Sequence, residues 1–201
     1  VVSIPGRGIY HVGTDGIYLF NVIDHKISVN ILDPIFRNED VNGVPGISDI
    51  TNCWLVEYKN NLYFGYTSTG RTYPSNIIRL DLNDDRIFYY LYNDGTELQF
   101  SAVEVDKSQD KFYAGDSNGY IWRLEDSTAT KDRNTAISWE LQTKNFQLQT
   151  RKHFPRWVKY DVNGVATGEV IIDEVSAQTH AINQNRNTRR RLIDPNNGSR
   201  V

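Results

Sequence analysis

Residues 111–126 read KFYAGDSNGYIWRLED and contain the strongest local fold signal in the sequence. Aromatic and aliphatic residues lie on both sides of a polar Gly-Asp-Ser-Asn-Gly centre. Asp, Asn and Gly favour tight turns, because their side chains bond the local backbone or because they tolerate positive φ. The stretch therefore predicts a β-hairpin whose aspartate organises the turn. A cation-binding turn is the alternative interpretation, since carboxylate oxygens are also calcium ligands.

Two earlier stretches repeat this pattern. Residues 8–21 read GIYHVGTDGIYLFN, with Thr-Asp-Gly as the turn expected to need positive φ, and residues 61–82 read NLYFGYTSTGRTYPSNIIRLDL. Their first aromatic residues align as Tyr10, Tyr63 and Tyr113. Periods of about 40–50 residues built from short strands are typical of β-propeller blades, and a closed ring takes about 4–8 of them. We therefore expect further blades to come from other sequence or from elsewhere in an assembly.

Other strand-like runs and turn signals fill the spaces between the hairpins. The turn dipeptide Asn42-Gly43 and the triplet Asn93-Asp94-Gly95 separate these runs. The strand-like runs are residues 26–32, 50–58, 86–92 and 98–105.

The fold class predicted from these signals is all-β, with three parts. Residues 1–126 are predicted to be partial β-propeller blades, about three repeats of ~50 residues. Residues 127–135 are a polar linker, and residues 136–201 are predicted to form a small antiparallel β-sandwich, incomplete at its C-terminal end. Within that last part, residues 165–175 predict a strand, whereas residues 176–191 carry few large apolar side chains and are interpreted as a loop or an irregular strand.

Composition narrows the functional class. The chain has 201 residues and a net charge of −3, which argues against a dedicated nucleic-acid binder. No run approaches the ~18–20 apolar residues of a membrane span, and the start lacks the features of a signal peptide. The single cysteine, Cys53, cannot form an internal disulfide and is interpreted as a buried structural residue, with a reactive thiol as the alternative. Because methionine is absent, we expect the chain to be a fragment of a longer polypeptide.

No motif for catalysis, cofactor binding or metal binding is found, so the chain is predicted not to be an enzyme and to need no cofactor. Asp81, Asp84 and Asp85 could serve as a glycosidase acid/base pair or as calcium ligands, but a solvated turn is the favoured interpretation. Two sets of side chains are interpreted as ordinary strand, surface or core residues. They are the scattered histidines, His11, His25, His153 and His180, and the tryptophans Trp54, Trp122, Trp139 and Trp157.

Two groups of cationic residues are the candidate interface. The dense run is Arg189, Arg190 and Arg191, with Arg186 and Arg200 near it in sequence. Three interpretations stay open: charge that protects an edge strand, a contact with acidic faces of a neighbouring subunit, or a contact with DNA phosphates. The second group consists of Arg151, Lys152 and Arg156.

The order of these elements resembles a class of tailed-bacteriophage virion proteins. The blade ending AGDSNGYIWRLED is followed by a polar linker, AISWELQTKNF, RKHFPRWVKYDVNG and the Arg-rich TRRRLI. These segments are similar to tail nozzle or hub-like subunits with a β-propeller and a β-sandwich. The resemblance implies a structural protein of the phage tail, packed with copies of itself in a cyclic ring and with other tail proteins, around a channel that could pass DNA. The polar segment 180–187 departs from a regular sandwich strand.

Two other functions fit the same elements. A cell-surface or secreted β-propeller could bind glycan or protein on its top face, and a propeller-type glycoside hydrolase could use the carboxylates of residues 81–85. Glycan binding by the isolated chain would favour the first of these functions. Turnover that is lost on Asp→Asn changes would favour the second.

Overall fold

The structure is a computed structural model that describes residues 1–28, 32–84, 86–138, 140, 157–160, 166–172, 175–182 and 188–191. The chain divides into two compact units, Val1–Glu140 and Leu141–Val201. The described residues form short antiparallel strands and a single four-residue helix, α1 (Asp33–Phe36). The all-β prediction is therefore confirmed.

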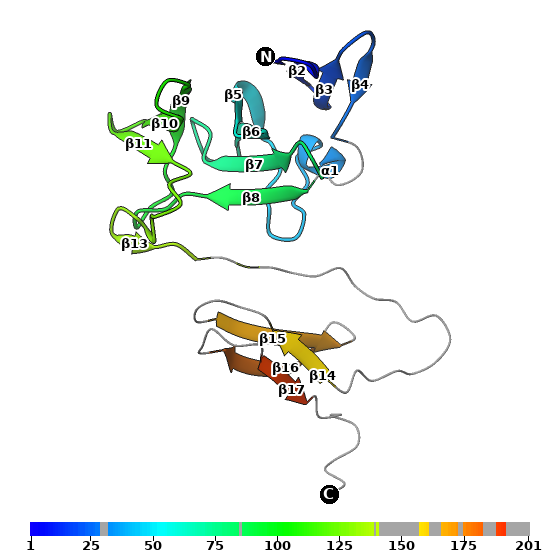
Figure 1. The fold of residues 1–201 in the computed structure, drawn as a ribbon, viewed down its shortest axis with the longest axis vertical. Helices are drawn as coiled ribbons and strands as arrows, with labels where there is room; N and C mark the ends of the chain where they lie inside the picture. The colour runs from blue at the N-terminus through cyan, green and yellow to red at the C-terminus, as the bar shows by residue number, and fades with distance from the viewer. Residues whose placement is uncertain are drawn as a thin grey trace, which may run out of the picture. The chain divides into compact units, whose positions relative to one another are not determined.

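Three antiparallel sheets build the first unit, and in each of them neighbouring strands follow one another in sequence (Figure 1). The first sheet consists of β1 (Val2–Ile4), β2 (Gly8–Gly13), β3 (Gly16–Phe20) and β4 (Asp24–Lys26). The second sheet consists of β5 (Asp49–Tyr58), β6 (Asn61–Thr67), β7 (Asn76–Asp81) and β8 (Ile87–Leu91). The third sheet consists of β9 (Phe100–Asp106), β10 (Lys111–Asp116) and β11 (Ile121–Leu124). The three repeated hairpins predicted from sequence are confirmed as β2–β3, β6–β7 and β10–β11.

The turns agree with the sequence prediction in part. Gly119 has a φ of 86°, and Asn42 and Gly43 have φ values of 51° and 80°, as tight turns require. The turn between β5 and β6 also has two positive φ angles, 50° at Lys59 and 60° at Asn60. These two residues lie between the strand-like run 50–58 and the hairpin 61–82 predicted from sequence, so the position of this turn is confirmed.

The expectation of positive φ in the β2–β3 turn is wrong, because none of residues 14–16 has one. Gly16 is needed for space instead. A Cβ there would lie 2.5 Å from Ser28 Oγ, which accepts a hydrogen bond from the Ile17 backbone N–H at 2.9 Å. The glycine therefore lets the buried Ser28 hydroxyl reach the hairpin backbone.

The second sheet is covered on both faces, because successive side chains in a strand point to opposite sides. One hydrophobic cluster joins Leu62, Phe64 and Tyr66 of β6 to the first sheet and α1. A second cluster joins the intervening Tyr63 of β6 and Ile77 of β7 to the third sheet. The first strands of the three sheets also lie side by side, since β1 contacts β5 and β5 contacts β9.

A small hairpin follows the third sheet. Its strands, β12 (Lys131–Asp132) and β13 (Thr135–Ala136), fall across the segment 127–135 that was predicted as a linker. Asp132 Oδ2 accepts a hydrogen bond from the Asn93 backbone N–H at 3.1 Å, and Arg133 Nη1 lies 3.2 Å from Asp94 Oδ2. The segment is thus held by the first unit, which extends to Glu140.

Two two-stranded ribbons make up the described part of the second unit. β14 (Trp157–Tyr160) pairs with β17 (Thr188–Arg191), and β15 (Ala166–Ile172) pairs with β16 (Val175–Ile182). The strand predicted over 165–175 therefore ends at Ile172, and Val175 begins the next strand. Residues 176–182, interpreted from sequence as a loop or an irregular strand, belong to β16, whose pairing with β15 shifts register between Val170 and Ile171, so the irregular-strand alternative is the one observed. Backbone pairing does not require large apolar side chains, so a strand forms here in spite of the polar composition.

Candidate functional site

The acidic turn of residues 116–120 is an organised hairpin turn. Asp116 Oδ1 accepts hydrogen bonds from the backbone N–H groups of Asn118 (2.8 Å) and Tyr120 (2.9 Å). Asp116 Oδ2 accepts one from Trp122 Nε1 at 2.8 Å. Both oxygens of this buried carboxylate thus face N–H donors, which leaves them poorly placed to bind a cation. The turn interpretation of the sequence is confirmed.

These hydrogen bonds set the charge state of Asp116. Burial alone would raise the pKa of this carboxyl, but the hydrogen bonds from Trp122 and from the turn backbone outweigh it. The pKa of Asp116 therefore lies below its usual range. A carboxyl with a lowered pKa stabilises the fold at neutral pH, and that contribution is lost as the pH falls below about 3.9 toward the folded-state pKa.

Replacing Asp116 with asparagine is expected to cost about 1–3 kcal/mol at pH 7, because an amide NH2 would face N–H donors. The stability gap between parent and variant should narrow as the pH falls through about 4. Urea unfolding at several pH values measures this gap. Asp110→Asn is the control, since that exposed carboxylate forms a surface ion pair with Lys59 (2.9 Å) and its loss should have a much smaller effect. A gap for Asp116→Asn that stays constant from pH 7 to pH 3 would contradict this account.

The carboxylates near residue 84 also form a turn. Asp81 Oδ1 accepts a hydrogen bond from the Asn83 backbone N–H at 2.9 Å. Arg86 Nη2 lies 2.6 Å from Asp84 Oδ2 and 3.7 Å from Asp81 Oδ2. The hydrogen bond from Asn83 lowers the pKa of Asp81, and Arg86 adds to this. A glycosidase acid needs a raised pKa, so the environment of Asp81 suits a turn better than acid catalysis. Asp85 lies outside the described residues.

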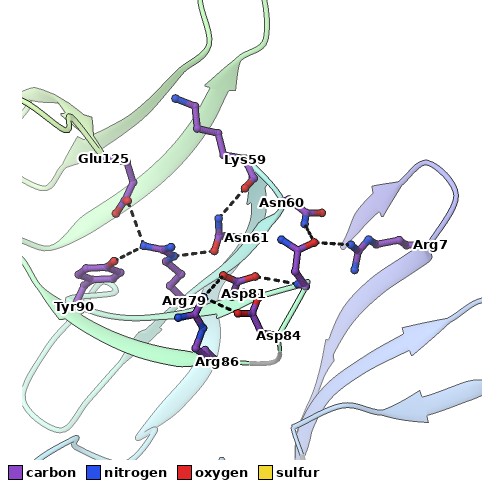
Figure 2. Close-up of polar contacts among 11 residues, drawn as sticks. Arg7, Lys59, Asn60, Asn61, Arg79, Asp81, Asp84, Arg86, Tyr90 and Glu125 are labelled. Atoms are coloured by element: carbon purple, nitrogen blue, oxygen red, sulfur yellow. Dashed lines mark hydrogen bonds and ion pairs between the residues drawn. The ribbon is translucent and has the colours of Figure 1, made fainter. Parts of the chain in front are cut away.

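A polar network around Arg79 links the second and third sheets (Figure 2). Arg79 of β7 donates to Asn61 Oδ1 through Nε and to the Tyr90 hydroxyl through Nη1, both at 2.8 Å. The same Nη1 lies 3.9 Å from Glu125 Oε2, just beyond β11 of the third sheet. The Tyr92 hydroxyl donates to Glu125 Oε1 at 3.3 Å. The network therefore ties three polar groups of the second sheet to one carboxylate of the third.

The tyrosines of this network remain protonated. Burial raises the pKa of Tyr92 well above its usual value, and the nearby Glu125 carboxylate raises it further. Tyr63 of β6 also lies near Glu125, and its pKa is raised by the same two causes in the same order. Their hydroxyls are thus hydrogen-bond donors, which suits a structural clamp. Sequence analysis missed this network because its members come from different strands and carry no local motif.

A second polar contact joins the first and second sheets. Arg7, in the turn before β2, donates to the Leu82 carbonyl oxygen. It also lies 3.5 Å from Asn83 Oδ1, and Figure 2 shows this side of the network with Arg7 and Asn60 labelled. Asn60 donates to the same Asn83 oxygen. Each junction between neighbouring sheets in the first unit therefore carries an arginine contact beside its apolar cluster.

The histidines and the cysteine do not form a metal centre where the structure describes them. His11 Nε2 lies 2.9 Å from Asp24 Oδ1, and the His11 ring stacks on Tyr18 at 5.4 Å between centroids. Among the described residues, no three His, Cys, Asp or Glu side chains come close enough to hold a metal ion. Cys53 packs against the first hydrophobic cluster, and burial raises the pKa of its thiol, which disfavours the reactive thiolate. His25 is exposed on β4, and His180 lies on β16.

The four tryptophans lie in different parts of the structure. Trp54 and Trp122 pack against the second hydrophobic cluster, which confirms them as core residues. Trp157 lies on β14, opposite Arg191. His153 and Trp139 lie outside the described residues.

The arginine run lies on a strand of the second unit. Arg189, Arg190 and Arg191 are consecutive residues of β17. The register of this strand with β14 places Arg189 directly opposite Lys159. The other cationic candidates lie outside the described residues: Arg151, Lys152, Arg156, Arg186 and Arg200.

No family model, curated protein or solved structure matches this chain. Within the ranges that the structure describes, no helix has the length and apolar character of a membrane span.

Proposed function

We propose that this chain is a structural subunit of a tailed-bacteriophage particle that acts by packing side by side with copies of itself in a cyclic ring. The observation that carries the proposal is the arrangement of the first unit. Three consecutive antiparallel sheets stack face to face, and the first strands of neighbouring sheets lie in contact.

This arrangement supports the assignment of the three sheets as β-propeller blades. A blade is an antiparallel sheet, usually of four strands, and blades repeat radially around a central channel. The first two sheets have four strands each, and the third has three among the described residues. In this proposal β1, β5 and β9 are the strands closest to the channel. The two ribbons β14–β17 and β15–β16 are then parts of the adjoining β-sandwich.

In this proposal the β14–β17 ribbon, which carries Lys159 and Arg189–Arg191, fixes how neighbouring subunits of the ring are aligned. Charged groups across an interface set orientation and specificity more than raw affinity. The opposition of Arg189 and Lys159 fits a ribbon that meets acidic residues of a neighbouring subunit. The tail of the virion is the location that the sequence resemblance implies, with other tail proteins as further partners and DNA passing through the channel.

Charge reversal of the run is expected to weaken assembly while leaving the fold intact. The variant is Arg189→Glu/Arg190→Glu/Arg191→Glu, and the measurement is native mass spectrometry of the protein as its natural source makes it, with circular dichroism to check folding. Parent protein should form a closed cyclic oligomer, and the variant smaller species. Reversal of three exposed lysines of the first unit, Lys59, Lys107 and Lys131, changes net charge equally and should leave the oligomer intact.

Three outcomes would contradict this role. A reversed variant that assembles as well as parent protein would remove the interface role of the arginines. A parent protein that stays monomeric at every concentration would overturn the ring itself. Tight duplex DNA binding that weakens steeply with salt, and is lost in the variant, would assign the run to DNA phosphates instead.

A further inference from the structure

The three sheets can be compared position by position, because the repeated tyrosine occupies the same place in each. Tyr10, Tyr63 and Tyr113 lie on the second strand of their sheets. Two residues after each tyrosine, the cross-strand partner on the third strand is an isoleucine in all three sheets. These pairs are Val12 with Ile17, Gly65 with Ile77 and Gly115 with Ile121.

The isoleucine faces the following sheet wherever one is present. Ile17 is 1% exposed in the cluster between the first and second sheets, and Ile77 is 1% exposed in the cluster between the second and third. Ile121 of the third sheet is 80% exposed. The third sheet thus exposes a large β-branched side chain at this position of the repeat. In the other two sheets the isoleucine at the same position is fully buried.

The opposite face shows the same pattern at the other end of the stack. The residue before the tyrosine pairs with a third-strand residue, and this pair faces the preceding sheet. In the second and third sheets the pairs are buried, Leu62 with Leu80 and Phe112 with Leu124. In the first sheet the equivalent residues, Ile9 and Phe20, are 40% and 45% exposed.

We propose that a second copy of this chain covers these faces head to tail, so that the Ile9–Phe20 face of one copy packs on the Ile121 face of the next. The inference rests on the proposed ring and names the surfaces that close it. The stack inside one chain twice joins the same two kinds of face, so a second copy offers a partner of matching shape. A heterologous contact of this kind generates a ring when its rotation closes.

Charge complementarity supports the same contact. Arg123 is the cross-strand partner of Tyr113, as Arg79 is of Tyr63. Arg79 reaches Glu125, which follows the third strand of the next sheet. In the first sheet the third strand ends at Phe20, and the first acidic residue after it is Asp24, whose side chain is 53% exposed. Within its own chain Arg123 Nη1 lies 3.1 Å from Asp126 Oδ2. In the proposed contact its guanidinium also meets Asp24 of the next copy.

Two single variants test the contact. Phe20→Arg alters one face and Ile121→Arg alters the other, and both replace exposed side chains, so each variant should fold as parent protein does by circular dichroism. Each variant alone is expected to raise the dissociation constant of the oligomer about tenfold or more, measured by mass photometry.

The decisive measurement uses a mixture of the two variants, because Phe20→Arg keeps an intact Ile121 face and Ile121→Arg keeps an intact Ile9–Phe20 face. An equimolar mixture should therefore form a one-to-one complex that grows no further. Ile137→Arg, at an exposed apolar residue outside both faces, is the control and should assemble as parent protein does.

Each other outcome overturns the inference in a distinguishable way. If parent protein forms a ring and both variants do so equally well, the head-to-tail contact is wrong and the proposed ring stands. If only Phe20→Arg loses assembly, the first-sheet face binds itself or another partner. If both variants dissociate and their mixture stays monomeric, the two faces do not meet. If parent protein never assembles, the ring and the contact fail together.

Discussion

Replacing Phe112 with alanine is expected to lower the free energy of unfolding of the first unit by about 3–5 kcal/mol. Phe112 is 0% exposed and lies on β10, where it contacts three aromatic rings of the second sheet. Its ring centroid lies 5.2 Å from Tyr63, 5.7 Å from Tyr58 and 6.5 Å from Trp54. Truncation would remove the side chain that joins the second and third sheets. It would also leave a cavity, because the surrounding aromatic rings are fixed to their strands and can move only partly into the vacated space.

Urea unfolding followed by circular dichroism measures this loss. Phe88→Ala is the matched control, since Phe88 is a partly exposed phenylalanine on β8 whose ring lies 4.9 Å from the Arg79 guanidinium. Its removal should cost no more than about 1 kcal/mol. If the two variants are equally stable, Phe112 does not hold the third sheet in place.

The hairpins were predictable from sequence because their signals are local. In residues 111–126, strand-forming residues and turn residues lie within a few positions of one another, and Asp116 bonds groups no more than six residues away. The break between the predicted runs 50–58 and 61–82 locates the β5–β6 turn, in which Lys59 and Asn60 both have positive φ. The sequence left β16 open between a loop and an irregular strand, because backbone pairing with β15 forms the strand in spite of its polar composition.

The contacts between sheets could not be predicted in this way. Arg79 and Glu125 are far apart in sequence, and nothing near either residue indicates the other. The sequence also does not predict that Ile121 is exposed, because Ile17 and Ile77 occupy the same position of the repeat and are buried. Repeat position predicts which face a residue is on, but the stacking of sheets decides whether that face is covered.

Side-chain packing on the second sheet also explains why a larger residue in place of Gly65 would be costly. Gly65 of β6 pairs with Trp54 of β5, and the indole ring lies over the glycine. A Cβ on Gly65 would lie 2.6 Å from Trp54 Cδ2 and closer still to two other ring atoms. The ring has little freedom to move, because Trp54 Nε1 donates to the Phe100 carbonyl oxygen at 3.2 Å and the ring meets Phe112 edge to face.

Gly65→Ala is therefore expected to destabilise the first unit by about 1–3 kcal/mol or more, as overpacking of a rigid core does. Gly115→Ala is a closely matched control, because Gly115 is the repeat equivalent on β10 and a Cβ there meets nothing within 4 Å. That variant should be neutral or slightly stabilising, since alanine restricts the unfolded chain. Thermal unfolding of both variants, and of Gly65→Ala combined with Trp54→Leu, makes the test. If the indole is the obstacle, Gly65→Ala should cost much less when Trp54 is leucine, and simple additivity of the two changes would show that the clash lies elsewhere.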